Sequence, residues 1–327
     1  IYLAIQPEGG LPNYNLAAAF GLALLVMGLA LMALYWRILG RGRSYVVITG
    51  QGYRTTPLRL GAWRLAAGAF TAVYFGLTLM LPLIVLLWVS FSAYIRPFSR
   101  QALGELTVAA YGHLAQLLGW DPIINTLLLV IFTPTLALVL SFGVSWIVTR
   151  TRLRRRGALD TLAFLPHATP SILMAVAFGF LFLSIFRVVP IYGTIWSLVL
   201  VVAIMHLPFG TRAINATMVQ IHTELEEAGR VAGIPGRIIV WRVLAPLLAP
   251  VLFTTWLWLW LIAYREVTVP LVLSSPNNQV IATSVWRLWQ TASLPEAAAL
   301  GAIVICLAIV VLAPSGRAVR RFTAAFA

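Results

Sequence analysis

The chain has 327 residues, of which 61% are hydrophobic and only 10% are charged, and its formal net charge is +14. With a mean hydropathy of +0.93, this composition excludes an ordinary soluble domain and predicts an all-α polytopic membrane protein. All 23 basic residues are arginine, so neither a Walker A lysine nor a Schiff-base lysine exists in this sequence.

Apolar runs long enough to cross a bilayer, which takes about 20 helical residues, recur along the whole chain. At the third run, Asp121 is expected to be the N-cap and Pro122 the first helical residue. About seven spans are predicted, at residues 16–36, 65–90, 122–148, 161–186, 193–212, 246–264 and 296–313.

The connections between these runs alternate in charge. One set holds 18 of the 23 arginines and four of the nine acids, and the other set holds five of each. The positive-inside rule therefore places the arginine-rich set in the cytoplasm, the N-terminus of the sequence outside and the C-terminus inside. On this topology the arginine run from Arg152 to Arg156 is expected to anchor a turn at the membrane surface, and no nucleic-acid partner is expected.

A polar stretch precedes the sixth run and lies on the cytoplasmic side of this topology. Thr223 is expected to N-cap a short helix with Glu226 as its capping-box partner. The glycines and the proline of residues 233–236 are expected to end that helix, and a second helix is expected from about Arg237. One side of the first helix would carry almost no side-chain atoms, because its residues there are small, so another protein could approach its backbone closely. These residues are Ala228, Gly229, Ala232 and Gly233.

The spacing of this stretch resembles the cytoplasmic coupling loop of ABC-importer permeases, whose pattern is Glu-Ala-Ala, three residues, Gly, nine residues, Ile, any residue, Leu-Pro. Gly229, Val243 and Ala245 depart from the pattern, each replacing one small or aliphatic residue by another. The resemblance implies a type-I ABC-importer transmembrane fold whose coupling loops are gripped by a cytoplasmic ATPase dimer. The residues it assigns to ATPase coupling are Glu227, Ala228, Gly229, Gly233, Pro235 and Pro246.

Residues 37–64 form a linker rich in glycine and arginine, with one possible short strand at Tyr45–Thr49. The linker resembles the joint between the two halves of fused ferric-iron-type permeases, and the segment Arg265 to Pro270 resembles them loosely. The resemblance implies that residues 1–64 are the last helix of an upstream half plus the linker. Residues 65–327 would then be a six-span domain with its core at about 121–313. Because the first residue is Ile1 and no signal-peptide pattern precedes the first span, we expect a longer protein.

Polar residues and prolines recur from the third span to the sixth. Intramembrane prolines bend helices, and serine or threonine hydroxyls hydrogen-bond within and between helices. Kinks and helix packing explain these residues as well as a lining of the solute pathway does. The candidate pathway-lining residues are Asn125, Thr133, Ser141, Thr169, Ser171 and Thr254.

The outer segment 265–295 is long, with a turn expected at 274–278 and a short amphipathic helix around Trp286–Trp289. It would shape the outer mouth of the pathway or meet a delivery protein, and a tryptophan belt at the membrane surface explains it equally well.

The sequence offers no clear catalytic or metal chemistry. No metal site and no cofactor are predicted, because the histidines have no ligand neighbours at the spacing of a metal site, and Cys306 has no disulfide partner. The absence of a charged side chain firmly in mid-bilayer argues against an ion-coupled carrier and favours an external energy source. The scattered histidines are His113, His167, His206 and His222.

The resemblance therefore predicts a non-enzymatic permease subunit in the bacterial inner membrane that passes a small solute, with ferric iron as the leading substrate. The implied partners are a cytoplasmic ATPase dimer, an extracytoplasmic solute-binding protein, a second transmembrane half and membrane lipid. Permeases for polyamines, thiamine or phosphonates are built alike and remain alternatives. A stand-alone secondary carrier and a membrane-bound enzyme are the alternatives from other classes.

Overall fold

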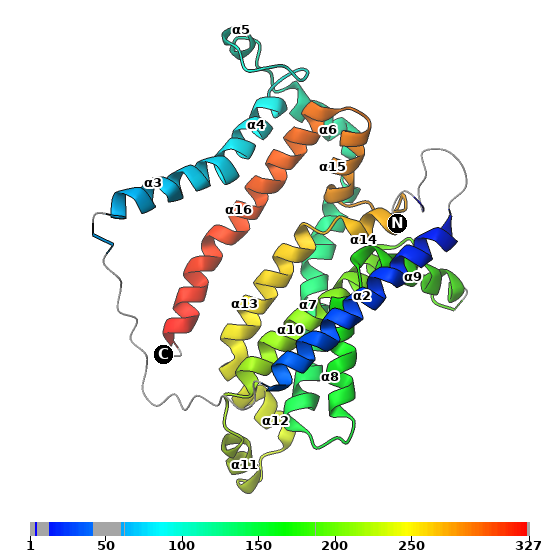
Figure 1. The fold of residues 1–327 in the computed structure, drawn as a ribbon, viewed down its shortest axis with the longest axis vertical. Helices are drawn as coiled ribbons and strands as arrows, with labels where there is room; N and C mark the ends of the chain where they lie inside the picture. The colour runs from blue at the N-terminus through cyan, green and yellow to red at the C-terminus, as the bar shows by residue number, and fades with distance from the viewer. Residues whose placement is uncertain (1–3, 5–12, 42–59, 62, 187, 326–327) are drawn as a thin grey trace. The chain divides into compact units, whose positions relative to one another are not determined.

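Every regular element in the described part of the chain is a helix, which confirms the all-α prediction. The computed structural model describes residues 4, 13–41, 60–61, 63–186 and 188–325, so the possible strand at Tyr45–Thr49 lies outside them. The chain forms two units, which are described separately. Unit 1 comprises residues 1–29, 118–284 and 307–327, and unit 2 comprises residues 30–117 and 285–306. Figure 1 shows the helices of both units.

Six helical stretches in the described residues are long and apolar enough to cross a membrane. They match six of the seven predicted runs, because runs of about 20 apolar residues satisfy their backbone polar groups in lipid only as helices. In order they are Asn15–Leu34 within α2 (Tyr14–Arg41), Trp63–Ser90, α7 (Asp121–Arg150), α10 (Ile195–Met218), Gly236–Val272, and Leu294–Ala313 within α16 (Leu294–Ala325).

The fourth predicted run, 161–186, is not one straight span. It is divided between α8 (Arg156–Phe164) with the 3-10 turn η3 (Leu165–Ala168) and α9 (Ser171–Ser184), with a bend of 110° between the two parts. Thr169 at the break is extended, with φ −101° and ψ 126°. The residue before a proline disfavours the α conformation, so Pro170 explains why the helix stops at this point. The fourth run is therefore a bent pair of helices, which counts as a seventh span if its two parts cross the membrane together.

Unit 1 is built on α7, α10 and α13 (Ala245–Tyr264), which pack against one another. The closest approach joins α7 and α10, where a Cβ added to Gly210 would lie 2.2 Å from the Oγ of Ser141. One turn further, the Ser145 hydroxyl donates to the Thr211 carbonyl at 3.3 Å. Small residues and hydroxyl bonds are what hold membrane helices together when lipid removes the hydrophobic driving force.

The first turn of α7 also fixes the segment that follows α14 (Thr268–Val272). The Asn125 amide donates to the carbonyls of Asn277 and Gln279, at 3.2 and 3.0 Å. The predicted turn is confirmed, since the Asn278 side chain accepts from the Ser275 amide at 2.7 Å. The amphipathic helix is also confirmed as α15 (Ile281–Gln290). At the start of α7, the N-cap position is Trp120, one residue before the predicted Asp121.

Two π-helical segments precede prolines. In unit 2, η2 (Gly76–Met80) links α3 (Trp63–Phe75) to α4 (Leu81–Ser90), and Pro82 follows it. In unit 1, η4 (Val240–Leu244) links α12 (Gly236–Ile239) to α13, and Pro246 follows it. A proline lacks the amide and its ring crowds the carbonyl four residues earlier, so a local widening of the helix keeps the segment continuous.

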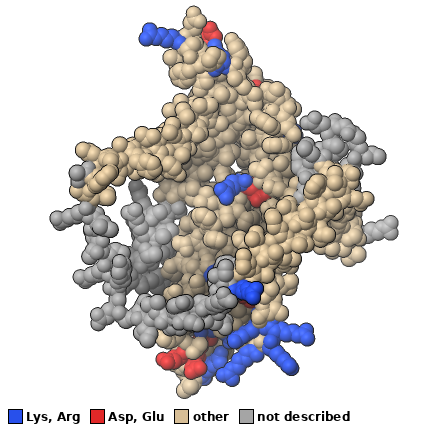
Figure 2. Space-filling view, in the orientation of Figure 1, with Lys and Arg blue, Asp and Glu red and all other residues tan. Residues whose placement is uncertain are grey.

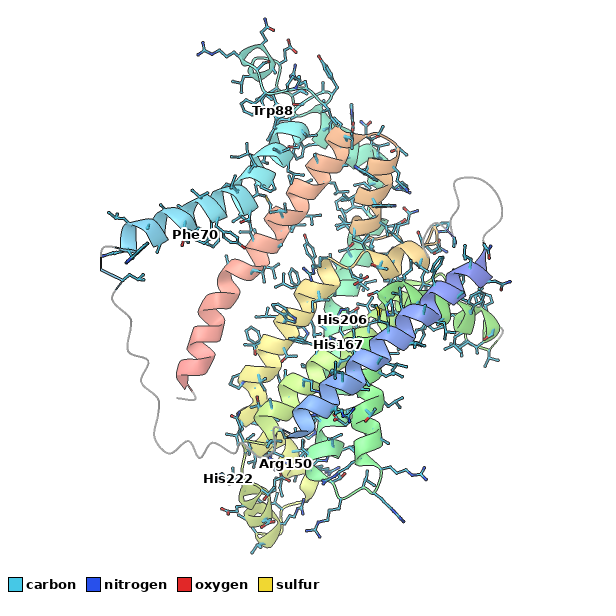
Figure 3. The ribbon with its side chains drawn as sticks, viewed as in Figure 1. Phe70, Trp88, Arg150, His167, His206 and His222 are labelled. Atoms are coloured by element: carbon cyan, nitrogen blue, oxygen red, sulfur yellow. The ribbon has the colours of Figure 1, made fainter. Side chains whose placement is uncertain are left out.

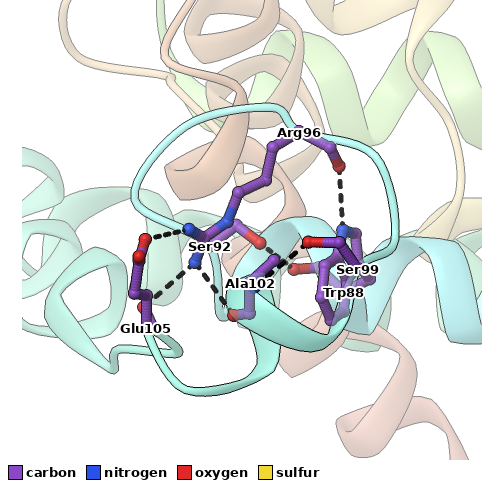
Figure 4. Close-up of polar contacts among 6 residues, drawn as sticks. All are labelled: Trp88, Ser92, Arg96, Ser99, Ala102 and Glu105. Carbon is purple, nitrogen blue, oxygen red and sulfur yellow. Dashed lines mark hydrogen bonds and ion pairs between the residues drawn. The ribbon is translucent and has the colours of Figure 1, made fainter.

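Unit 2 carries a loop after α4 that is folded around one arginine (Figure 4). The Arg96 side chain is only 10% exposed and pairs with the Glu105 carboxylate. Its guanidinium also donates to the carbonyls of Ala102 and Glu105, each at 3.1 Å, while the Trp88 indole donates to the Arg96 carbonyl at 3.0 Å. These bonds hold α5 (Arg100–Leu103) and the end of α4 as one structure.

Replacing Arg96 by alanine should loosen this loop. The loss of two carbonyl bonds to a charged group is expected to lower the local opening free energy by about 2 kcal/mol. The ion pair should add little, because its Glu105 partner is 64% exposed to solvent. Hydrogen exchange of the amides in 91–108 should therefore speed up. The exposed Arg100, changed to alanine in the same loop, should leave exchange unchanged; equal effects of the two substitutions would contradict this account.

Candidate coupling site

The predicted short helix between the fifth and sixth spans exists as α11 (Glu224–Val231). It follows the end of α10 and precedes α12, and Figure 1 shows it beyond the ends of α7 and α10. Three acids in its first turn suit the positive end of the helix macrodipole. Acidic and basic side chains gather at this end of the molecule in Figure 2.

Gly233 ends α11, as predicted. Its φ is +74°, in the left-handed region that glycine adopts without a Cβ penalty. The Gly233 amide donates to the Arg230 carbonyl at 2.9 Å, and the Ile234 amide donates to the Gly229 carbonyl at 3.0 Å. This pair of bonds is the Schellman motif, which satisfies the last carbonyls of the helix and turns the chain towards α12.

The predicted capping box at the start of α11 is wrong. Thr223 occupies the N-cap position, but its side chain makes no capping bond. Glu226 is buried and lies against α7, where its Oε1 is 3.0 Å from the Nε of Arg150. The carboxylate therefore pairs with a charge from a distant part of the chain, because a buried acid needs an opposite charge to offset the loss of water.

The predicted bare side of α11 also needs correction at Gly229. A Cβ on Gly229 would lie 2.9 Å from the Cδ1 of Ile239, a residue of α12 that is itself 2% exposed. Gly229 is therefore small because α12 packs against it, within the same chain. The remaining small residues Ala228, Ala232 and Gly233 are exposed, as the close approach of a partner requires.

The outward surface of α11 combines apolar and acidic side chains. Val231 is 89% exposed and Leu225 is 49% exposed, and Ala228 lies on the same exposed surface. Glu224 and Glu227 are exposed beside them. Exposed aliphatic residues beside charged ones are typical of a protein–protein interface and offer no nucleophile or acid–base pair. We call this surface, formed by Glu224, Leu225, Glu227, Ala228 and Val231, the α11 patch.

The two predicted prolines of the site mark the path from α11 into the membrane. Pro235 occupies the N-cap position of α12, and Pro246 lies in the first turn of α13 just after η4. Both are exposed. The second predicted helix is therefore present, and it is continuous with the sixth span through a π-helical segment.

The candidate pathway residues do not form one cluster. Asn125, Thr133 and Ser141 are buried on α7, where Asn125 and Ser141 bond to neighbouring segments. Thr169 and Ser171 are half-buried at the bend before α9, and Thr254 is exposed on α13 and bonds to its own helix. Their role along a solute pathway stays a prediction.

Sequence reasoning missed the partners that position α11. Arg150 was counted only as one of many cytoplasmic arginines, and Ile239 only as part of the second helix expected from about Arg237. The Arg150 contact could not be found from spacing, because α7 and α11 are far apart in the sequence, and the Ile239 contact depends on how the turn at Gly233 directs α12. Among the described residues, no group of three histidine, cysteine, aspartate or glutamate side chains could hold a metal ion.

Comparison with known proteins places this arrangement in a family. The model of the binding-protein-dependent transport system inner membrane component matches residues 137–323. The chain belongs to this family. The matched region contains α11, the Gly233 turn and α12, so the permease carries its candidate site inside the part that defines the family.

The permease is similar to curated permeases of polyamine and of ferric transport systems. It is 28% identical over 191 residues to the spermidine/putrescine transport system permease protein PotC of Haemophilus influenzae, covering 58% of this chain and 73% of the relative. It is 22% identical over 316 residues to the ferric transport system permease protein FbpB of Actinobacillus pleuropneumoniae. That alignment covers 92% of this chain and 43% of the relative. The chain thus spans less than half the length of that ferric permease.

The fold of the permease is that of solved importers. A bacterial ABC transporter involved in the import of the acidic polysaccharide alginate aligns with a TM-score of 0.62 at 19% identity, covering 79% of this chain and 96% of that one. The predicted type-I importer fold is thereby confirmed.

Gly233→Ala should destabilise the end of α11. A Cβ in the left-handed region costs roughly 1–2 kcal/mol, so local opening should become more frequent and tryptic cleavage after Arg230 should accelerate about tenfold. Gly236→Ala is the control, because Gly236 has open space around it and no positive φ. Equal cleavage rates in the two variants would show that the Gly233 turn is not under this constraint.

Proposed function

We propose that the permease is a membrane subunit of an ABC importer and that a cytoplasmic ATPase dimer binds the α11 patch. The observation that carries this proposal is an exposed helix with an apolar centre and acidic side chains, held at the end of the membrane helices by a Schellman turn. Movement of the ATPase subunits would act on α11 as a rigid body and re-orient the helices to which it is attached. Hydrolysis itself belongs to the ATPase.

The cytoplasm is the proposed side for α11. The connections that flank it belong to the arginine-rich set, which the positive-inside rule assigns to the cytoplasm. The N-terminus of this sequence would then lie outside the bacterial inner membrane and the C-terminus inside. Binding of a cytoplasmic ATPase would itself test this orientation, because such a partner reaches only the inner side.

Two halves are proposed to enclose the pathway. Residues 1–64 would hold the last helix of an upstream half and the linker, and residues 65–327 the second half. The greater length of the ferric relatives supports this proposal. The pathway would be lined in part by the candidate residues of α7, α9 and α13, and an extracytoplasmic solute-binding protein would deliver the solute.

Ferric iron is the proposed substrate. The ferric permeases align over 92% and 84% of this chain, including the linker region, whereas the PotC relative aligns over 58%. A polyamine is the second candidate, because the PotC relative has the higher identity. Both solutes are cationic in water.

Ala228→Trp should abolish ATP-dependent transport. The indole would stand in the centre of the α11 patch, where Ala228 is exposed, and would hold the ATPase away without disturbing the packed side of the helix. Co-purification of the ATPase should fall at least tenfold while membrane insertion persists. Gly112→Trp in α6 (Ala109–Leu118), at an exposed position with open space, is the size-matched control. Undiminished ATPase binding by Ala228→Trp would refute the assignment of the α11 patch.

The substrate can be tested separately. Vesicles with the complete transporter, including its own binding protein and ATPase, should accumulate labelled ferric iron on addition of ATP. Excess unlabelled spermidine should not reduce this uptake. Uptake of spermidine and not of iron would assign the polyamine instead, and transport without ATP would favour a stand-alone carrier.

A further inference from the structure

One arginine closes the end of α10. The Nη2 of Arg150, the last residue of α7, donates to the carbonyls of Met218 and Ile221, each at 2.7 Å. Met218 is the last residue of α10 and Ile221 lies in the turn that follows, so the cation stands at the negative end of the helix macrodipole. Arg150 therefore joins the ends of α7 and α10 through the backbone, so the bond does not depend on which side chains α10 carries.

The same guanidinium reaches α11. Its Nε lies 3.0 Å from the Oε1 of Glu226, and both side chains are only 5% exposed. A second cation, Arg230, lies 3.8 Å from the other carboxylate oxygen but is 62% exposed. Figure 3 places Arg150 at the end of the membrane helices where α11 begins. One buried charge thus touches the end of α7, the end of α10 and the first turn of α11.

The Arg150–Glu226 pair is close but poorly aligned. Although Nε and Oε1 are 3.0 Å apart, neither atom makes an aligned hydrogen bond. A buried ion pair of this kind is weak evidence for stability, because apolar residues of similar size often hold a fold equally well. A charged pair does fix the orientation of the elements that carry it, and this pair keeps its two charges in contact without an aligned bond. The contact is therefore suited to an element that takes two positions.

We propose that the Arg150–Glu226 pair is the joint that transmits movement of α11 to α7 and α10. Both residues act as positioning residues, since they are buried and lie away from the α11 patch. The proposal rests on the proposed function, because it explains how a force applied to the α11 patch reaches the membrane helices. It assigns to the buried side of α11 a role distinct from ATPase binding.

The test uses the complete transporter in vesicles and measures solute transported per ATP hydrolysed. Glu226→Gln keeps the shape of the side chain and removes its charge. We expect the ATPase to remain bound and to hydrolyse ATP, while the ratio of transport to hydrolysis falls at least tenfold. Glu226→Asp, which keeps the charge, should recover part of the ratio. Asp121→Asn removes the same charge from an exposed position at the opposite end of α7, outside the α11 patch, and its ratio should stay close to that of the unmodified protein.

The outcomes separate the two proposals. The role of the Arg150–Glu226 pair would be refuted if Glu226→Gln left the ratio unchanged. It would also be refuted if the loss of transport were matched by an equal loss of hydrolysis or ATPase binding. Either result would leave the proposed function standing. Failure of the unmodified transporter to use ATP would refute the proposed function itself. If Glu226→Gln does not accumulate in the membrane, Arg150→Lys decides the question. This substitution keeps the positive charge but removes the guanidinium, whose separate N–H groups reach both the end of α10 and α11. The ratio should again fall.

Discussion

The contact between α7 and α10 is the constraint on which the rest of unit 1 depends. In its middle, Gly210 lies so close to Ser141 that no side chain fits between the helices. At its end, Arg150 binds the carbonyl of Met218, the last residue of α10, and that of Ile221 in the turn that follows. The first contact sets the distance between the helix axes and the second sets their register. Because α11 is attached to the same arginine, the position of the coupling helix follows from the packing of these two helices.

Local chemistry made part of this structure predictable. Apolar length located the spans, because a helix in lipid must satisfy its own backbone polar groups. Gly233 located the end of α11, because a left-handed position favours glycine over every other residue. Both inferences need only residues that are neighbours in sequence.

Contacts between distant residues made the rest unpredictable. The carboxylate of Glu226 had a plausible local partner in a capping box, yet a buried cation from α7 binds it instead. Gly229 fitted the prediction that one side of α11 carries only small residues and faces a partner protein. In the structure the Ile239 side chain fills the space beside Gly229. At 161–186 hydropathy located the apolar run, and the bend before Pro170 divides it into two helical parts. The length of an apolar run shows where an apolar segment lies, but it does not show whether that segment is one straight helix.

Ion pairs at the ends of the membrane helices follow a common pattern. The Asp160 carboxylate on α8 accepts from Arg212 on α10 at 3.2 Å, and the same guanidinium lies 4.7 Å from the Phe164 ring centroid. Arg150 and Glu226 join α7 to α11 in the same way. Charge is costly inside lipid and is tolerated where an opposite charge accompanies it. Each pair therefore ties a polar segment to the helix core, α8 through Asp160 and α11 through Glu226. The centre of the bundle is instead joined by small residues, which let the helices approach each other closely.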